Sequence, residues 1–326
     1  MPVRSMTDWA VVVAAACALG LGCAPASAQP AAAGAVPARP PAAGSEMAVA
    51  FGDARWAQVI GHAGVPLNVL SKGDPAQPVV LLVHGFRQSS LSWVRQFAST
   101  LPASCHLVAV DLRGHGNSGQ PWQADAYDSA RPWADDLARV IAALDLKRPL
   151  LVGWSFGGNV AMDFLRLHGD VPLAGLLLVS TGAGLVLAPP ASPGTPPPPT
   201  ASANLLTNMA SVEQSMALLF EPGLDPALRQ VFSAASMRVS PFVDRGVLSR
   251  RATAKSNADL LPALNIPVTL VFGGRDRVVP ATVTSAVKAL LPRARVEDFA
   301  DAGHAPFLDD AERFNRLLAS LQCGRP

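Results

Sequence analysis

Short apolar runs alternate with longer amphipathic segments along most of the chain. The runs 79–83, 107–110 and 150–152 contain no polar residue, which is typical of parallel strands that are buried on both faces. The segments 56–60 and 66–70 flank a glycine-containing turn and are predicted to form a hairpin. About eight strands are predicted in all, at 56–60, 66–70, 79–83, 107–110, 150–152, 173–179, 268–272 and 295–299.

Helical periodicity fills most of the intervals between these strands. Pro280 and Pro306 lie near the first turn of a predicted helix, where proline is favourable. Gly169 and Pro292 follow the end of one. Helices are predicted at 91–101, 132–144, 158–168, 281–291 and 306–321. This alternation of strands and helices predicts an α/β fold with a mostly parallel, doubly wound sheet.

One segment, 181–264, interrupts the alternation after the sixth predicted strand. It contains no strand-like run, but a proline-rich stretch at 188–199 and then several helical pieces. The segment is therefore predicted to be a helical lid over a pocket, with a hinge or spacer as the alternative. The helix starts predicted within it are Ser211, with Gln214 as its capping-box partner, Pro226 and Pro241.

The first residues have the pattern of an export signal. Arg4 precedes the apolar run 9–21, and Ala26-Ser27-Ala28 provides a cleavage site of small residues. This pattern predicts a secretory signal peptide at 1–28 and a periplasmic or secreted protein. The apolar run is shorter than the roughly 20 residues that a membrane-spanning helix needs, so no permanent span is expected. The alternative is a lipid anchor at Cys23, because the residues before it loosely resemble a bacterial lipoprotein box.

Residues 29–46 are rich in Ala, Pro and Gly and are predicted to form a linker. The α/β core is then expected at 47–180 and 265–326, with the lid at 181–264 between its two parts. The linker composition offers almost no large apolar side chain to pack, so the fold should begin at its end.

Composition and charge narrow the classes of function. The chain has 326 residues, of which 50% are hydrophobic and 15% charged, enough to bury a sizeable core. Its formal net charge is +2 and no basic run exceeds Arg250-Arg251, so no nucleic-acid partner is expected. After removal of the signal peptide only Cys105 and Cys323 remain, without a Cys/His cluster. No metal site is therefore expected.

The pentapeptide Gly153-Trp154-Ser155-Phe156-Gly157 carries the first chemical signal. It lies between a predicted strand and a predicted helix, which is the context of a nucleophile elbow. The elbow would present Ser155 at the N-terminus of the helix, where the helix dipole favours developing negative charge. The alternative is a Gly/Ser turn without chemistry.

A serine nucleophile needs a base, and the base needs an acid. His304 follows the last predicted strand, and Asp276 follows the strand before it. Ser155, Asp276 and His304 are therefore the candidate catalytic residues. Asp301 also lies near His304, but it is predicted to cap a turn. The acid of such a triad can also follow the sixth strand, but residues 180–184 contain no carboxylate, and this favours Asp276.

An acyl transfer also needs donors for the oxyanion. The run 83–86 leaves a predicted strand through a glycine turn. In this architecture the backbone N–H groups that follow the glycine and the nucleophile form the oxyanion hole. The candidate donors are therefore the backbone N–H groups of Phe86 and Phe156.

Together these motifs resemble the α/β-hydrolase superfamily over roughly residues 51–322. The motifs are 84–86, 111–119, 153–158, 273–280 and 303–304. Residues 127–146 further resemble the branch of serine esterases and cofactor-free haloperoxidases. Haloalkane dehalogenases and many epoxide hydrolases of this fold use an aspartate nucleophile, so Ser155 argues against both. The resemblance implies that His115 is structural and that His84 orients its loop.

The resemblance implies an exported serine hydrolase, most simply a carboxylesterase acting on a small or medium hydrophobic ester through an acyl-enzyme. No metal or organic cofactor is implied. Trp93 and Trp154 are expected to bind the acyl chain, or else to belong to the core. The alternatives are a perhydrolase, an amide, thioester or carbon–carbon hydrolase, and a non-catalytic binding protein.

In this fold the first and last helices cover the same face of the sheet. Cys105 follows the first of them and Cys323 ends the last. A disulfide between these two cysteines is therefore a reasonable expectation, and an exported protein would meet conditions that permit it. The sequence does not predict the oligomeric state.

Overall fold

The computed structural model describes residues 46–169, 173–185, 200–253 and 255–324. The predicted signal peptide, nearly all of the predicted linker and the whole proline-rich stretch lie outside the described residues. No helix among the described residues is long and apolar enough to cross a membrane.

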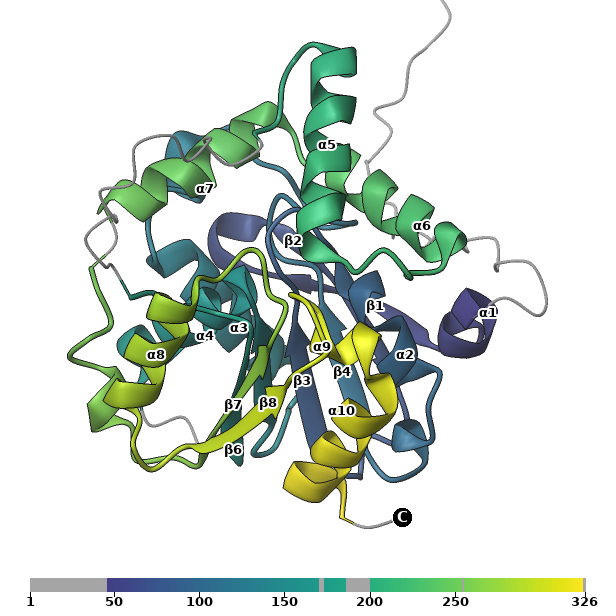
Figure 1. The fold of residues 1–326 in the computed structure, drawn as a ribbon, viewed down its shortest axis with the longest axis vertical. Helices are drawn as coiled ribbons and strands as arrows, with labels where there is room; N and C mark the ends of the chain where they lie inside the picture. The colour runs from purple at the N-terminus through teal and green to yellow at the C-terminus, as the bar shows by residue number, and fades with distance from the viewer. Residues whose placement is uncertain (1–45, 170–172, 186–199, 254, 325–326) are drawn as a thin grey trace, which may run out of the picture. The chain divides into compact units, whose positions relative to one another are not determined.

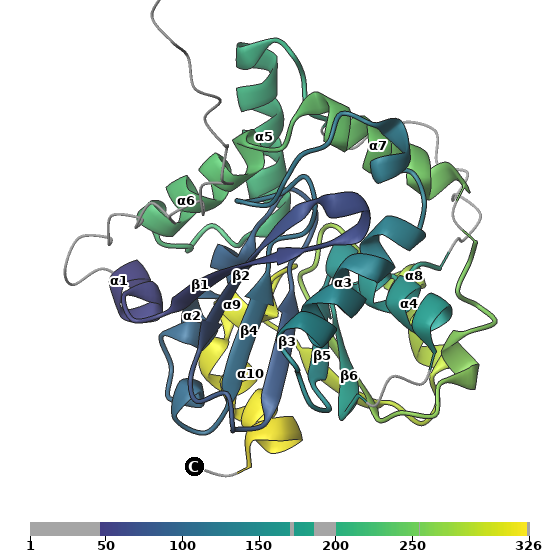
Figure 2. The same ribbon diagram turned by 180° about the vertical axis from the view of Figure 1, so that it is seen from behind.

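Eight strands form one sheet in the order β1-β2-β4-β3-β5-β6-β7-β8 (Figures 1 and 2). β1 and β2 form the predicted hairpin, β2 and β4 are also antiparallel, and the remaining neighbours are parallel. This topology confirms the predicted fold. The strands are β1 (Arg55–Ile60), β2 (Pro66–Lys72), β3 (Val79–Val83), β4 (His106–Val110), β5 (Leu150–Trp154), β6 (Gly175–Val179), β7 (Val268–Gly273) and β8 (Arg295–Phe299).

The continuous apolar strands pack into two hydrophobic cores, one on each face of the sheet, because successive side chains of a strand point to opposite faces. In β3, Val79, Leu81 and Val83 pack with α3, α4 and α8, whereas Val80 and Leu82 pack with α1, α2, α9 and α10. Figure 1 shows α3, α4 and α8 on one side of the sheet and α2 and α10 on the other. The core helices are α1 (Glu46–Phe51), α2 (Val94–Phe97), α3 (Arg131–Ala143), α4 (Phe156–His168), α8 (Ala281–Leu290), α9 (Pro306–Asp309) and α10 (Ala311–Leu318).

Two predicted helices are interrupted. The predicted helix 306–321 breaks at Asp310, whose φ of −131° and ψ of 66° are not helical. The Asp310 carboxylate accepts a hydrogen bond from the backbone N–H of Arg313 and so begins a new helix. The predicted helix 91–101 similarly divides into a 3-10 turn at Ser90–Trp93 and the single turn of α2.

A helical insertion follows β6, as predicted, and we call its three helices the cap. The cap consists of α5 (Leu205–Leu219), α6 (Pro226–Met237) and α7 (Pro241–Thr253), which lie together at one end of the molecule (Figure 1). α6 and α7 begin at the predicted prolines. The predicted start at Ser211 is wrong, because Asn204 caps α5 through the N–H of Thr207 and leaves Ser211 within the helix.

Arg87, in the loop after β3, joins the cap to the core. Its guanidinium donates to Ser211 Oγ at 3.0 Å and Asn208 Oδ1 at 3.3 Å on α5. Its Nε lies 3.8 Å from Asp244 Oδ1 on α7, and the Ser236 hydroxyl on α6 donates to its carbonyl oxygen at 2.9 Å. One buried arginine therefore holds all three cap helices against this loop.

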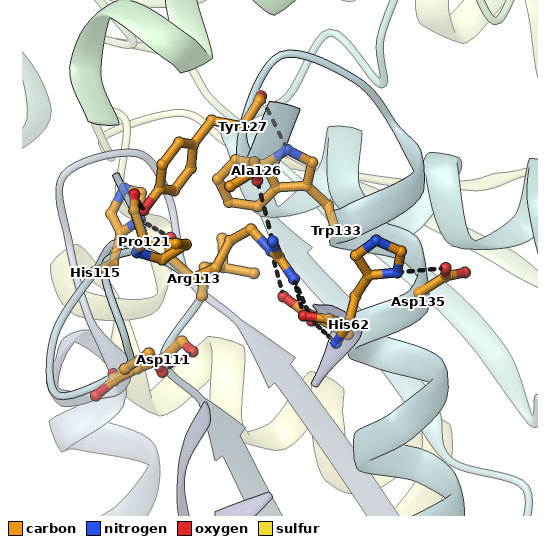
Figure 3. A network of polar contacts seen from close by, with 12 residues as sticks. His62, Asp111, Arg113, His115, Pro121, Ala126, Tyr127, Trp133 and Asp135 are labelled. Carbon is orange, nitrogen blue, oxygen red and sulfur yellow. Dashed lines mark hydrogen bonds and ion pairs between the residues drawn. The ribbon is translucent and has the colours of Figure 1, made fainter. Parts of the chain in front are cut away.

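A second buried arginine organises the loop after β4 (Figure 3). Arg113 donates to both carboxylate oxygens of Asp136 on α3, each at 2.7 Å. It also donates to the carbonyl oxygens of Ala126 and His62, at 3.1 and 3.2 Å. Its planar guanidinium therefore fixes the β1–β2 turn, the loop after β4 and α3 relative to one another.

His84 and His115 are fully buried in the loops after β3 and β4. His84 Nε2 accepts from the N–H of Leu112 at 3.0 Å, so its proton lies on Nδ1 and is donated to the Gly85 carbonyl at 2.7 Å. Burial lowers the pKa of His84 to about 4. Burial and the neighbouring His84 lower the pKa of His115 to about 3. Both imidazoles are therefore neutral at pH 7.

Cys105 and Cys323 are joined by a disulfide, with their Cα atoms 5.1 Å apart. Cys323 ends a π-helical turn (Ala319–Cys323) that continues α10, and Cys105 immediately precedes β4. Both cysteines are buried in the core that α2 and α10 share. The disulfide therefore ties the last helix to the middle of the sheet.

Replacing both cysteines with alanine should lower the free energy of unfolding by about 2 to 5 kcal/mol, because the disulfide closes a long loop in the unfolded chain. Urea unfolding with and without reductant measures the change. Reductant should destabilise the parent protein and leave the Cys105→Ala/Cys323→Ala variant unaffected. Two free thiols in unfolded, unreduced mature protein would contradict the disulfide.

Arg87→Met should lower the free energy of unfolding by about 3 to 5 kcal/mol, since it deprives the buried Asp244 carboxylate of its arginine. Arg238→Met is the matched control, because this exposed arginine also joins the cap to the core, through the Gly116 carbonyl at 3.0 Å. The control should change stability by less than about 0.5 kcal/mol. Equal losses in the two variants would contradict the role given to Arg87.

His115→Phe should make stability less sensitive to acid. In the unfolded chain a histidine titrates near its ordinary pKa of about 6.5. Below this pH the histidine is protonated in the unfolded state, whereas the buried His115 of the folded state stays neutral. The parent should lose about 1.4 kcal/mol per pH unit for each such histidine as the pH falls from 6.5 toward the folded pKa. Urea unfolding between pH 7 and 5 should show a slope shallower by this amount in the variant. The same slope in parent and variant would show that a group other than His115 causes the loss of stability at low pH.

Candidate active site

Ser155 occupies the turn between β5 and α4 with φ 52° and ψ −116°. This left-handed conformation is strained for a residue with a side chain. The turn closes because α4 starts directly against β3: a Cβ on Gly157 would lie 2.3 Å from the Val83 carbonyl oxygen. Ser155 is consequently held at the first turn of α4, and its side chain remains partly exposed.

His304 and Asp276 meet from the loops that follow β8 and β7. His304 Nδ1 lies 2.9 and 3.0 Å from the two carboxylate oxygens of Asp276. The N–H groups of Val278 and Val279 donate to the same carboxylate at 2.8 and 3.0 Å. Burial alone would raise the pKa of Asp276, but the hydrogen bond and charge of His304 and these two N–H groups lower it below its usual value. Asp276 is therefore a carboxylate at neutral pH.

The free edge of the His304 ring is available for proton transfer. Since Nδ1 donates to Asp276, Nε2 is the acceptor, and this buried atom has no hydrogen-bond partner among the described residues. The indole N–H of Trp154 donates to the His304 carbonyl oxygen at 2.8 Å, which places the histidine loop beside the residue that precedes Ser155. The alternative acid, Asp301, is 89% exposed and pairs with Arg275 instead.

The candidate oxyanion donors come from the two segments that meet at Ser155. A Cβ on Gly85 would lie 3.2 Å from the Ser155 Cβ, so the loop after β3 passes directly against the elbow. Phe86 follows in this loop, and Phe156 is the first residue of α4. Their rings are 6.0 Å apart, edge to face. The structure thus brings the two predicted donor residues together beside Ser155.

Trp93 and Trp154 do not line the cavity beside Ser155, which corrects the expectation that they bind an acyl chain. Both are fully buried. Trp93 packs against Phe307 at 4.4 Å between ring centroids, and Trp154 packs against the same ring at 4.9 Å. Their large apolar surfaces therefore support the His304 loop from the core side.

The cavity that opens at Ser155 has a volume of about 390 Å³. Its lining is more polar than the hydrophobic acyl pocket expected from the sequence. Polar residues on α4 alternate with apolar ones at helical spacing, and this is the signal that could have identified Asn159 and Asp163 beforehand. The lining residues are Ser155, Phe156, Asn159, Asp163, Ser180, Thr181, Gly182, Gly184, Leu185, Arg250, Lys255, Asn257, Val278 and Val279.

The part of the chain that the structure describes contains no group of three or more His, Cys, Asp or Glu side chains that could hold a metal ion. The groups that the structure provides at Ser155 and in the two loops after β7 and β8 include a hydroxyl, an imidazole, a carboxylate and backbone N–H groups. Such a set can transfer an acyl group by nucleophilic attack with general acid–base assistance.

Comparison with known proteins gives a family for this arrangement. The model of the alpha/beta hydrolase family matches residues 80–317. A solved putative aryl esterase from Burkholderia cenocepacia is 33% identical, with a TM-score of 0.73 over 82% of this chain and 97% of that one. An esterase from Rhodococcus sp. ECU1013 is 29% identical, with a TM-score of 0.72 over 81% and 97%. The AB hydrolase superfamily protein YisY of Bacillus subtilis is 26% identical over 80% of this chain and 96% of its own length. The chain belongs to the alpha/beta hydrolase family.

Proposed function

We propose that this hydrolase is a serine esterase in which Ser155, His304 and Asp276 form the catalytic triad. The observation that carries the proposal is the buried His304 ring. Its Nδ1 is held by an ionised carboxylate, while Nε2 has no hydrogen-bond partner among the described residues and can therefore accept a proton. A histidine that only stabilised a turn would have no need of this arrangement.

In the proposed reaction His304 Nε2 takes the proton of the Ser155 hydroxyl while the oxygen attacks the ester carbonyl carbon. The N–H groups of Phe86 and Phe156 stabilise the oxyanion, each contributing on the order of 10²–10³ in rate. His304 then protonates the leaving alcohol, and an acyl-enzyme remains. A water molecule then gives a proton to His304 Nε2 and attacks the acyl carbon. His304 returns this proton to Ser155 Oγ as the bond between Oγ and the acyl carbon breaks, which releases the carboxylic acid and restores the enzyme. Asp276 stabilises the imidazolium in both steps.

Esters are the proposed substrates because the chain is similar to a solved putative aryl esterase from Burkholderia cenocepacia and to a solved esterase from Rhodococcus. We further propose that the protein is exported by the predicted signal peptide at 1–28. The disulfide between Cys105 and Cys323 supports export, since disulfides persist mainly in oxidising compartments.

Ser155→Ala should abolish turnover of 4-nitrophenyl acetate, butyrate and octanoate by the mature protein, by about 10⁴-fold or more. The parent should also be labelled by a fluorophosphonate at Ser155, located by mass spectrometry, and the variant should not. Ser320→Ala is the matched control, because this serine lies in the C-terminal turn and donates to the Leu317 carbonyl. It should retain both labelling and turnover.

Labelling that persists in Ser155→Ala, or no labelling of either protein, would overturn the proposal and favour a non-catalytic binding protein. Faster formation of peracid from a carboxylic acid and hydrogen peroxide than hydrolysis of any ester would instead favour the perhydrolase alternative.

A further inference from the structure

The cavity at Ser155 follows one face of α4 away from the reactive serine. Phe156, Asn159 and Asp163 line it, and their spacing of three and four residues places them on one side of the helix. Asp163 lies eight residues beyond Ser155, or about 12 Å along the helix axis at about 1.5 Å per residue. The cavity therefore leads from the nucleophile to a polar end.

A buried ion pair forms this polar end. Arg250 of α7 pairs with Asp163, and only 4% and 7% of their surfaces are exposed. The Arg250 guanidinium lies 5.5 Å from the centre of the Phe156 ring, so it reaches back toward the residue that follows the nucleophile. Buried ion pairs are rarely better stabilisers than apolar side chains of the same volume. The ion pair lines the same cavity as Ser155, and this favours a role in binding.

The remaining polar groups favour a hydrogen-bonding ligand with negative charge. Ser180 also lines the cavity, close to Ser155, whose N–H donates to the Val179 carbonyl oxygen at 2.9 Å. The fully buried Ser180 hydroxyl has no hydrogen-bond partner among the described residues. Buried hydroxyls are normally satisfied, so this one has a donor to offer. The charged lining residues are two cations, Arg250 and Lys255, against one carboxylate, Asp163.

Protonation strengthens this bias. Burial raises the pKa of Asp163 to about 7, although Arg250 and Arg166 oppose the rise. A raised pKa means that protonation costs less at Asp163 than at an exposed aspartate, which favours a second negative charge beside Arg250.

The cavity holds the acid part of an ester rather than the alcohol part. His304 must protonate the leaving alcohol, so the alcohol has to lie against its ring. Ser155 lines the cavity and His304 does not. The group that extends into the cavity is consequently the acyl chain bound to Ser155.

We propose that the enzyme prefers esters whose acyl chain ends in a carboxylate, and that Arg250 binds this carboxylate where its guanidinium approaches the Phe156 ring. The proposal rests on the proposed esterase function of Ser155. The sequence led us to expect an ester with an uncharged hydrophobic acyl group. The substrate proposed here is instead a half-ester of a dicarboxylic acid. The alternative is that Arg250 and Asp163 only attach the cap to α4.

Two esters with six-carbon acyl chains test the preference: mono-4-nitrophenyl adipate, which carries the second carboxylate, and 4-nitrophenyl hexanoate, which does not. The measured quantity is the ratio of their kcat/KM values. A loss of activity that affects both esters equally does not change this ratio. The parent should favour the adipate half-ester by about tenfold or more, as expected for a charge-assisted hydrogen bond.

Arg250→Met combined with Asp163→Asn removes the pair without leaving a buried charge unpaired, and should lower this ratio about 10- to 100-fold. Asp163→Asn alone leaves the cation in place and should raise the ratio. Arg245→Met is the matched control, because this exposed arginine is on the same helix and outside the cavity lining. Its ratio should equal that of the parent.

Binding of adipate and hexanoate to Ser155→Ala, measured by calorimetry, provides a readout that does not need turnover. Adipate should bind more tightly than hexanoate, and the preference should disappear when Arg250→Met and Asp163→Asn are added. Equal binding of the two acids, or a kcat/KM ratio that the double variant leaves unchanged, would overturn the carboxylate site while the esterase function stands. Adipate binding without hydrolysis of either ester would overturn the esterase function instead.

Discussion

The site depends on how closely the first turn of α4 approaches β3. A Cβ atom on Gly157 would lie only 2.3 Å from the Val83 carbonyl oxygen. Any side chain at this position would therefore push the helix away from the sheet. The same approach forces Ser155 into a left-handed conformation with φ 52°. Several kcal/mol of packing around the turn must offset this strain, which costs on the order of 1–3 kcal/mol. The fully buried Trp154 is part of that packing.

The segments whose chemistry is local could be predicted from the sequence. Ser155 lies between a run of apolar residues and a helical pattern, and His304 and Asp276 each follow a strand, so chain order and strand ends were sufficient to bring them to one edge of the sheet. The break at Asp310 and the early start of α5 at Asn204 were not predicted. In both cases a side-chain oxygen accepts a hydrogen bond from a backbone N–H group and starts a helix. The periodicity of apolar residues does not indicate such capping.

The contacts between distant segments could not be predicted either. Arg250 and Asp163 are separated by 87 residues, and nothing in the sequence near either one indicates that they meet. Trp93 and Trp154 were expected at the pocket because aromatic side chains near a nucleophile commonly bind substrate. In the structure both tryptophans belong to the core, and the cavity is lined by α4, α7 and the segments after β6 and β7. Specificity in this fold thus resides in a surface that only tertiary structure assembles.

The disulfide has a consequence for the three residues of the proposed catalytic triad. Ser155, Asp276 and His304 all lie between Cys105 and Cys323, within one covalent ring. A single proteolytic cut in the cap, at 200–253, would separate Ser155 from the other two along the chain. The two fragments would nevertheless stay linked through the sulfur atoms, and the parallel strands β6 and β7 would still hold them edge to edge. A hydrolase built in this way can be cut once in its cap and remain one molecule.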